Sequence, residues 1–242
     1  MAAVATPVVS RMVNSASFLD VPAVPGMIVS LLGTGLGPIT GVAAAPNGSG
    51  VFDRQLANVK VIFDTFEAPI LFVSATQINA IVPYLVAPRL TTRVQVEVNG
   101  VRSNGIDLRV AAAAPGIFVL SAAGQGAILN QDNTVNGAGN PAARDSIVVI
   151  YATGEGQTNP PGVDGTIPGR STAYKVPVQR VRVRIGGLES EVLYAGSAPF
   201  LVSGAMQVNA KVPAGVTPGL SVPIELIVGE TSSAAGVTLA VR

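Results

Sequence analysis

The sequence predicts an all-β fold, in the form of two tandem immunoglobulin-like β-sandwich domains related by an internal repeat. Short runs of alternating apolar and polar residues recur along the 242 residues, and no stretch shows a helical period with caps. The 27 Gly and 18 Pro residues gather in the gaps between these runs, as expected for turns that join short strands. Segments of the first half then recur, in the same order, in the second half.

The alternating runs predict half-buried strands, because period-two alternation places the apolar side chains on one face of a strand. Asn99-Gly100 follows one such run and predicts a two-residue hairpin turn, since both residues tolerate a positive φ. The clearest runs are 59–63, 93–98, 180–185 and 237–241.

The repeat predicts the domain organisation. Its preserved order indicates a first sandwich over residues 1–114, which includes an extended N-terminal segment (1–18), and a second sandwich over residues 115–242. No long flexible linker separates the two, so a single sandwich or barrel built from two halves is the alternative. The matching segments are 13–16 with 135–138, 28–37 with 147–156, 59–63 with 181–185, 70–72 with 192–194, 77–83 with 207–213, and 106–110 with 237–241.

Composition excludes several classes of function. The chain has no Cys and no His, which excludes disulfides, thiol nucleophiles, the Ser-His-Asp triad and metal sites built on these ligands. A net charge of +1 argues against a nucleic-acid partner, and no apolar run is long enough to span a membrane. Lysine is scarce and no signal peptide opens the chain. We expect a non-enzymatic, exported β protein, with a cytoplasmic protein as the alternative.

Several long segments resemble a known family. They are AILNQDNTVN at 127–136, NPA at 140–142, IVVIYATGEGQTNPPGVDG at 147–165, and, in the first half, residues 25–38 and VSATQINAIVP at 73–83. Together they are similar to the uncharacterised C-terminal domain of acidobacterial (Solibacter-type) exported proteins. The run at 33–37 also resembles IPT/TIG immunoglobulin-like domains. The resemblance implies a β-sandwich fold, export, and a place in secreted or cell-surface proteins, and it supplies no catalytic residues.

Two glycine-rich runs occupy matching positions of the repeat. Gly33-Thr34-Gly35-Leu36-Gly37 has the glycine content of a phosphate-binding loop. However, its spacing is not that of a dinucleotide-binding turn, and Pro38 follows where a helix would have to begin. Because Gly154 and Gly156 repeat the pattern, we interpret both runs as structural turns.

A stripe of arginines is the candidate ligand-binding site. Arg180, Arg182 and Arg184 alternate along one predicted strand, so they should project from a single face. Such a stripe could bind an acidic polysaccharide or a phosphate-bearing polymer through bidentate contacts. The alternative is a charged edge strand that resists pairing with other chains.

Calcium is the only cofactor with candidate ligands. Asn130, Asp132 and Asn133 lie in one polar turn, and Glu155 and Asp164 flank a Gly/Pro-rich loop, which supplies the oxygen atoms that Ca²⁺ prefers. An Asx turn, in which the side chain binds its own backbone, explains Asp132 and Asn133 without a metal.

Other polar residues favour structural interpretations. The repeated pair Gln77 and Asn79, matched by Gln207 and Asn209, is expected to form amide hydrogen bonds within the sheets. Glu189 and Glu191 could act as a pair of glycosidase carboxylates, but same-face acids on a small sandwich are usually solvated.

The sequence therefore predicts a non-enzymatic module for cell-surface structure, adhesion or assembly. Its expected partners are other protein chains at the cell surface, with self-association through residues 1–18 by strand addition. An acidic-glycan-binding module that uses the arginine stripe is the alternative.

Overall fold

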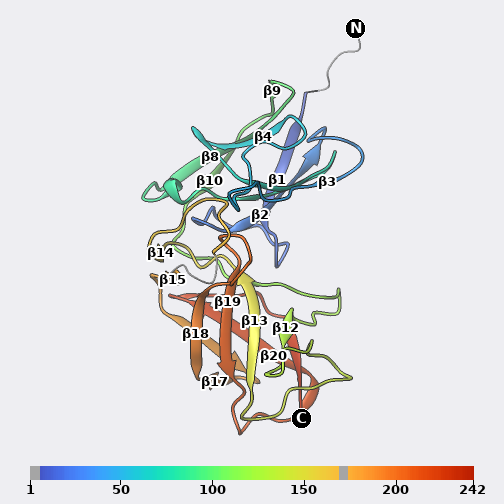
Figure 1. Cartoon of the computed structure of the whole chain (residues 1–242), viewed down its shortest axis with the longest axis vertical. Coiled ribbons are helices and arrows are strands. Elements are labelled where there is room, and N and C mark those ends of the chain that lie inside the picture. Colours follow the sequence, from blue (N-terminus) through green and yellow to red (C-terminus); the bar gives the residue numbers. More distant parts are fainter. Residues whose placement is uncertain (1–5, 169–173) are drawn as a thin grey trace.

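The computed structural model describes residues 6–168 and 174–242, and it confirms the predicted all-β class. Antiparallel strands and turns build nearly all of it, with one short 3₁₀ turn, η1 (Tyr84–Val86), as the exception in the described ranges. No helix in these ranges is long and apolar enough to cross a membrane. The first half of the chain lies above the second along the long axis of the molecule (Figure 1).

Two sheets with five strands each form the first half. One has the order β1-β2-β7-β6-β3, and the other has the order β10-β8-β4-β5 with β9 paired to β8. The strands are β1 (Val8–Asn14), β2 (Ile28–Thr34), β3 (Val42–Ala43), β4 (Val59–Phe63), β5 (Phe66–Glu67), β6 (Ile70–Val73), β7 (Gln77–Ile81), β8 (Thr91–Val98), β9 (Val101–Arg102) and β10 (Ile106–Arg109).

The second half repeats this plan. Its sheets have the orders β11-β13-β19-β18, with β12 paired to β13, and β17-β16-β20-β21, with β22 paired to β20; β14 and β15 form a separate ribbon. The strands are β11 (Gly116–Ile117), β12 (Ile128–Leu129), β13 (Ile147–Thr153), β14 (Thr158–Asn159), β15 (Val176–Pro177), β16 (Val181–Ile185), β17 (Leu188–Ser190), β18 (Val192–Ser197), β19 (Met206–Lys211), β20 (Gly219–Val228), β21 (Thr231–Ser232) and β22 (Thr238–Val241).

Each pair of sheets encloses its own hydrophobic core. In the first half, Leu31 and Ile78 of one sheet meet Val61 and Val96 of the other in a cluster confined to residues 9–114. In the second half the cluster is confined to residues 113–241. The alternation read from the sequence places these side chains inward, and their burial stabilises each sandwich. Corresponding core residues of the second half are Ile150, Val208, Val183 and Leu226.

Within each half, the strands that match in the repeat pair with the same register. Ile28 opposes Ile81 in the first half, and the residues that match them in the repeat, Ile147 and Lys211, oppose each other in the second. The same holds for β4 with β8 and for β16 with β20. The predicted hairpin turn is also present, because Asn99 (φ 49°) and Gly100 (φ 81°) connect β8 to β9.

The N-terminal segment is part of the first sandwich. Residues 8–14 form β1, which pairs along its length with β2 and buries Val9 and Met12 in the core. On the other side of β1, the Asn104 side chain both accepts a hydrogen bond from the Val9 N–H and donates one to its carbonyl, each at 2.9 Å. The segment expected to be free for strand addition is thus held within its own chain over residues 8–14. Positions 1–5 of this segment lie outside the described residues.

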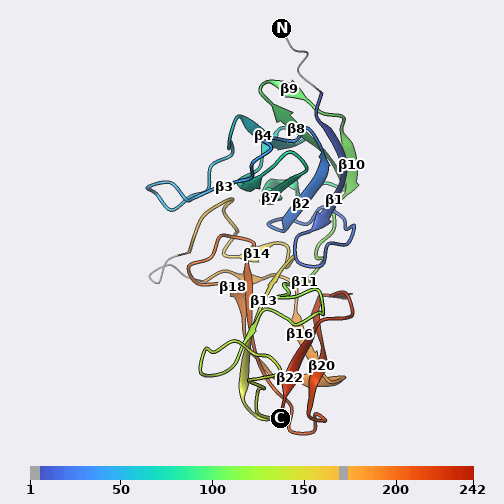
Figure 2. The same cartoon turned by 90° about the vertical axis from the view of Figure 1, so that its right-hand side faces the viewer.

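The halves are stacked in the same orientation. Strands β2 and β13 match in the repeat, and the start of β2 lies beside the end of β13, because the Ile28 N–H donates to Thr153 Oγ1. The lower end of the first half therefore meets the upper end of the second (Figure 2). The assignment of residues 1–114 and 115–242 to separate domains stays a prediction.

Candidate functional site at the junction of the two halves

The junction between the halves has a hydrophobic cluster of its own. Ile28 and Ile81, which lie side by side on β2 and β7, pack against Ala198 and Ala205 from the loop between β18 and β19. Isoleucine at these positions is directed away from the core of the first half, so its burial depends on the second half. The partly buried residues of this cluster are Leu71, Phe118, Tyr151 and Val202.

Hydrogen bonds also cross the junction at several places. The Tyr84 N–H donates to Asp164 Oδ1, and the Gln157 amide donates to the Tyr84 carbonyl, both at 2.9 Å. Backbone groups join the loop after β3 to the loop after β14, through Phe52 N to Gly165 O at 2.9 Å. These directional bonds fix the register of one half on the other, while the apolar contacts supply the driving force.

Glycines let the two backbones approach closely. A Cβ at Gly204 would lie 2.0 Å from the Gly26 carbonyl oxygen, and Gly204 has a φ of +92°. The ring of Tyr84 lies between glycines of both halves, since a Cβ at Gly26 or at Gly162 would come within 2.5 Å of its Cζ. Side chains at these positions would force the halves apart.

Glu155 is buried in this closely packed region. It follows β13 between Gly154 and Gly156, where added Cβ atoms would lie within 2.2 Å of the carbonyl oxygens of Ala114 and Ala112. Glu155 is only 3% exposed, and its Oε2 is buried with no hydrogen-bond partner among the described residues. Burial raises the pKa of Glu155 to about 8, against the opposing effect of its own backbone N–H. This pKa favours the protonated carboxyl group at pH 7.

Two further ionisable groups, Tyr84 and Asp164, lie at the junction. Burial raises the pKa of the Tyr84 hydroxyl far above its ordinary value, and the charges of Glu155 and Asp164 raise it further. Burial also raises the pKa of Asp164, while the Tyr84 N–H and then the charges of Arg54 and Lys175 lower it. Burial thus disfavours the charged form of each of these groups.

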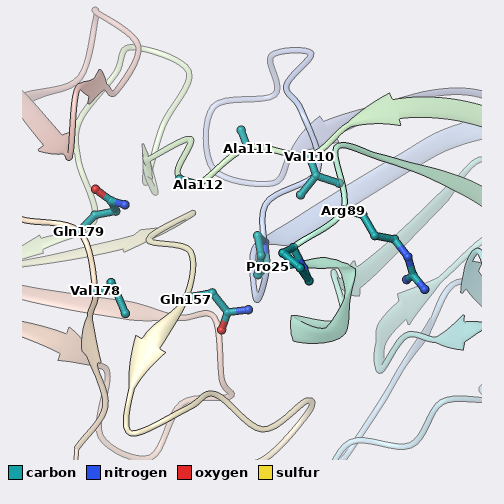
Figure 3. A pocket seen from close by; sticks show the side chains of 10 residues that line it. Pro25, Arg89, Val110, Ala111, Ala112, Gln157, Val178 and Gln179 are labelled. Carbon is teal, nitrogen blue, oxygen red and sulfur yellow. The ribbon is translucent and has the colours of Figure 1, made fainter.

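A groove opens beside this region (Figure 3). It has a volume of about 330 Å³ and walls from both halves. Arg89 lies at its rim, but its guanidinium is 3.6 Å from Asp64 and 4.6 Å from the Phe66 ring centroid, and its side chain points away from Gln157. The lining is mostly apolar and uncharged: Pro25, Ala87, Pro88, Val110, Ala111, Ala112, Gln157, Val178 and Gln179.

The arginine stripe is only partly available for a ligand. Arg184 forms ion pairs with Glu189 at 3.1 Å and with Glu225 at 3.4 Å. Arg180 and Arg182 form no ion pair among the described residues. They precede Arg184 at alternate positions, which places all three residues on the same face of the strand. The edge-strand alternative does not hold for Arg184, which lies between β17 and β20, whereas β17 does not extend as far as Arg182.

The five calcium candidates do not come together. Asp132 lies in a pocket with Ser146, at the start of β13, whereas Glu155 follows the end of this seven-residue strand, a separation of roughly 20 Å. The Asp132 carboxylate accepts hydrogen bonds from the Thr134 N–H and hydroxyl, as an Asx turn requires, and Asn133 has a φ of 65°. Asn130 binds the Asn140 carbonyl. Among residues 6–168 and 174–242, no cluster of three carboxylates could hold a metal ion.

The repeated amide pairs make the structural contacts expected of amides in a sheet. Gln77 donates to Asn79 at 2.8 Å, and Gln207 donates to Asn209 at 2.9 Å. Asn79 also accepts a hydrogen bond from Ser30 on the neighbouring strand. Glu189 is paired with Arg184, and Glu191 is exposed, so neither carboxylate lies in a buried site.

Sequence reasoning missed the role of the second glycine-rich run. It identified the run as a turn, and Gly154 and Gly156 do have positive φ values of 90° and 81°. The signal for a further role was present in the repeat, because Glu155 occupies the position that Leu36 occupies in the first half.

Comparisons with known proteins give no family. No protein-family model matches the sequence, and no curated protein sequence is similar to it. Among solved structures, a gamma-CGTase from alkalophilic Bacillus clarkii is similar with a TM-score of 0.30 and 13% identity, over 93% of this chain and 23% of that chain. The chain thus spans less than a quarter of the enzyme, and a likeness this low supports no conclusion about function.

Proposed function

We propose that the chain is a non-enzymatic, exported module of the bacterial cell surface, in which two immunoglobulin-like sandwiches act as one stiff body in structure, adhesion or assembly. The observation that carries this proposal is the closed junction. Ile28, Ile81 and Ala205 are buried there, and hydrogen bonds from both backbones cross it. A body of this kind transmits force and sets distances between its ends, which is useful in a surface protein.

Two further observations support it. The polar residues singled out for chemistry are mostly used inside the fold, as shown by the pairing of Arg184 with Glu189 and of Gln207 with Asn209. Side chains also satisfy backbone hydrogen-bonding groups on edge strands. Asn136 binds both the N–H and the carbonyl of Ala240, as Asn104 does for Val9. Closed edges suit a protein exposed to other chains outside the cell.

Cell fractionation tests the location. A tagged chain, expressed in the bacterium that encodes it, should be digested when intact cells are treated with protease, or be found in the medium. A chain that stays protected inside intact cells would contradict the proposal.

A pair of glycine variants tests the mechanical part. Gly204→Asp places a side chain against the Gly26 carbonyl and should loosen the junction, whereas a Cβ at Gly48 meets no atom within 4 Å, so Gly48→Asp is the matched control. We expect both variants to be exported, and only Gly204→Asp to weaken attachment or assembly. Equal behaviour of the two variants would show that the closed junction is not needed.

Acidic-glycan binding remains the second candidate, supported by Arg180 and Arg182, which no carboxylate of the described chain neutralises. It predicts salt-sensitive binding of a polyanion such as heparin that is lost in Arg182→Glu. Binding that is unchanged by this substitution would exclude the stripe.

A further inference from the structure

The two halves place different residues at one position of the repeat. Leu36 and Glu155 each follow a glycine with positive φ, Gly35 at 65° and Gly154 at 90°. Leu36 is fully buried in the core of the first half. Glu155 is buried just as deeply, but at the junction, so the same turn that closes a core in one half contacts the neighbouring half in the other.

The surroundings of Glu155 do not compensate a charge. The segments that meet its flanking glycines, 23–27 and 111–115, contain only uncharged side chains. The titratable group that interacts with the Glu155 charge is Tyr84 of η1, which interacts in turn with Asp164 of the loop after β14, and neither residue supplies a positive charge. Arg54 and Lys175 act on Asp164. An ionised carboxylate here would lack both a cation and a hydrogen-bond donor for Oε2.

We propose that Glu155 makes the closure of the junction depend on pH: its neutral form fits the closed junction, and its ionised form favours an open arrangement in which water reaches the carboxylate. This inference concerns the contact between the halves and does not depend on where the protein acts. A failed export experiment would leave it standing.

The direction of the effect follows from linkage. Burial raises the pKa of Glu155 from 4.5 to about 8 in the closed state, so the closed state holds one more proton than the open state between these values. The ratio of open to closed molecules should then rise about tenfold per pH unit across this range and level off above it. Below the lower value, Glu155 is protonated in both states and has no effect.

Amide hydrogen exchange can measure this ratio. The Ile28 N–H donates across the junction to Thr153, whereas the Val96 N–H donates to Ser103 within the first half, so the second amide is the internal control. Exchange rates are measured by NMR from pH 5 to pH 9 and divided by the intrinsic rate at each pH. The full chain is compared with Glu155→Leu, which copies Leu36, and with Glu155→Gln, which keeps a polar group of equal size.

We expect the opening constant at Ile28 to rise about tenfold per pH unit up to about pH 8 in the natural chain, and to stay constant in both variants. Because Val96 exchanges only when the first half unfolds, its opening constant should be far smaller than that of Ile28 at every pH. A flat profile at Ile28 in the natural chain would overturn the proposal. So would an equal rise in Glu155→Leu, or equal opening constants at Ile28 and Val96, which would indicate unfolding of the whole chain.

Discussion

The two halves share one strand register but differ at the turn that follows the matching strands β2 and β13. In the first half, Leu36 folds back into its own core at the free end of the molecule. In the second half, Thr153 at the end of β13 binds Ile28 of the neighbouring half, and the glycines on either side of Glu155 lie against residues 112 and 114. A repeated backbone therefore does not repeat its function. The turn that completes a core in one copy becomes an interface in the other.

The opposite ends of the halves differ in the same way. The junction face of the first half is built on Ile28 and Ile81, and the matching residues at the free end of the second half are Ile147 and Lys211. Lys211 forms an ion pair with Asp145 at 3.1 Å. A lysine that is paired with an aspartate therefore stands where the first half has Ile81, so this free end is not a copy of the face that meets the other half. We do not expect further chains to stack there through the same contacts.

The largest expected effect comes from removing the buried carboxyl. A group whose pKa rises from 4.5 to about 8 on folding stabilises the fold fully below pH 4.5, and this contribution is lost as the pH rises to about 8. The loss is on the order of 5 kcal/mol over that range. Glu155→Leu should remove this fall. Urea denaturation of both proteins at several pH values measures the difference, and parallel pH profiles would contradict the prediction.

The reciprocal change should harm the first half. Leu36→Glu places an acid without a partner in an apolar core, which should lower the free energy of unfolding by roughly 4 kcal/mol at pH 7. Calorimetry should show that the first half melts at a lower temperature. A melting curve like that of the natural chain would mean that the turn can rearrange to expose residue 36.

A smaller effect is expected from the close approach at Gly204. Gly204→Ala adds a Cβ 2.0 Å from the Gly26 oxygen, and the shift this forces should destabilise the chain by about 3 kcal/mol. Gly187 has a similar φ of +80° but open space around it, so Gly187→Ala shows the backbone strain alone, about 1 kcal/mol. Equal losses in urea denaturation would mean that the junction is not tightly packed there.

The smallest difference is expected between the two edge-closing asparagines. Asn136 is buried and binds Ala240 and Asn130, so Asn136→Ala should destabilise by about 2 kcal/mol. Asn104 lies at the surface, where water replaces part of its bonds, so Asn104→Ala should destabilise by about 1 kcal/mol. Thermal unfolding would rank the pair, and a larger loss for Asn104→Ala would reverse the assignment.

The fold class could be predicted because it depends on local patterns. Alternation at 93–98 and the Asn99-Gly100 turn are properties of neighbouring residues, and both appear as predicted. The junction could not be predicted, because it depends on which surfaces meet in space. In the sequence, Glu155 resembles any other residue of a glycine-rich turn. Its burial became visible only in the structure, where this turn lies against residues 112–114. The structure separates Asn130, Asp132 and Asn133 from Glu155 by the length of β13, and a calcium site at either place stays a prediction.

The most direct test is the titration of the Glu155 side chain itself. Carbon-13 NMR of the carboxyl group follows each glutamate from pH 3 to pH 10, and the spectrum of Glu155→Gln identifies the signal that belongs to residue 155. A buried, unpartnered carboxyl predicts a midpoint near 8. A midpoint near the ordinary value of 4.5 would show that water or a cation reaches Glu155, and would contradict a closed junction.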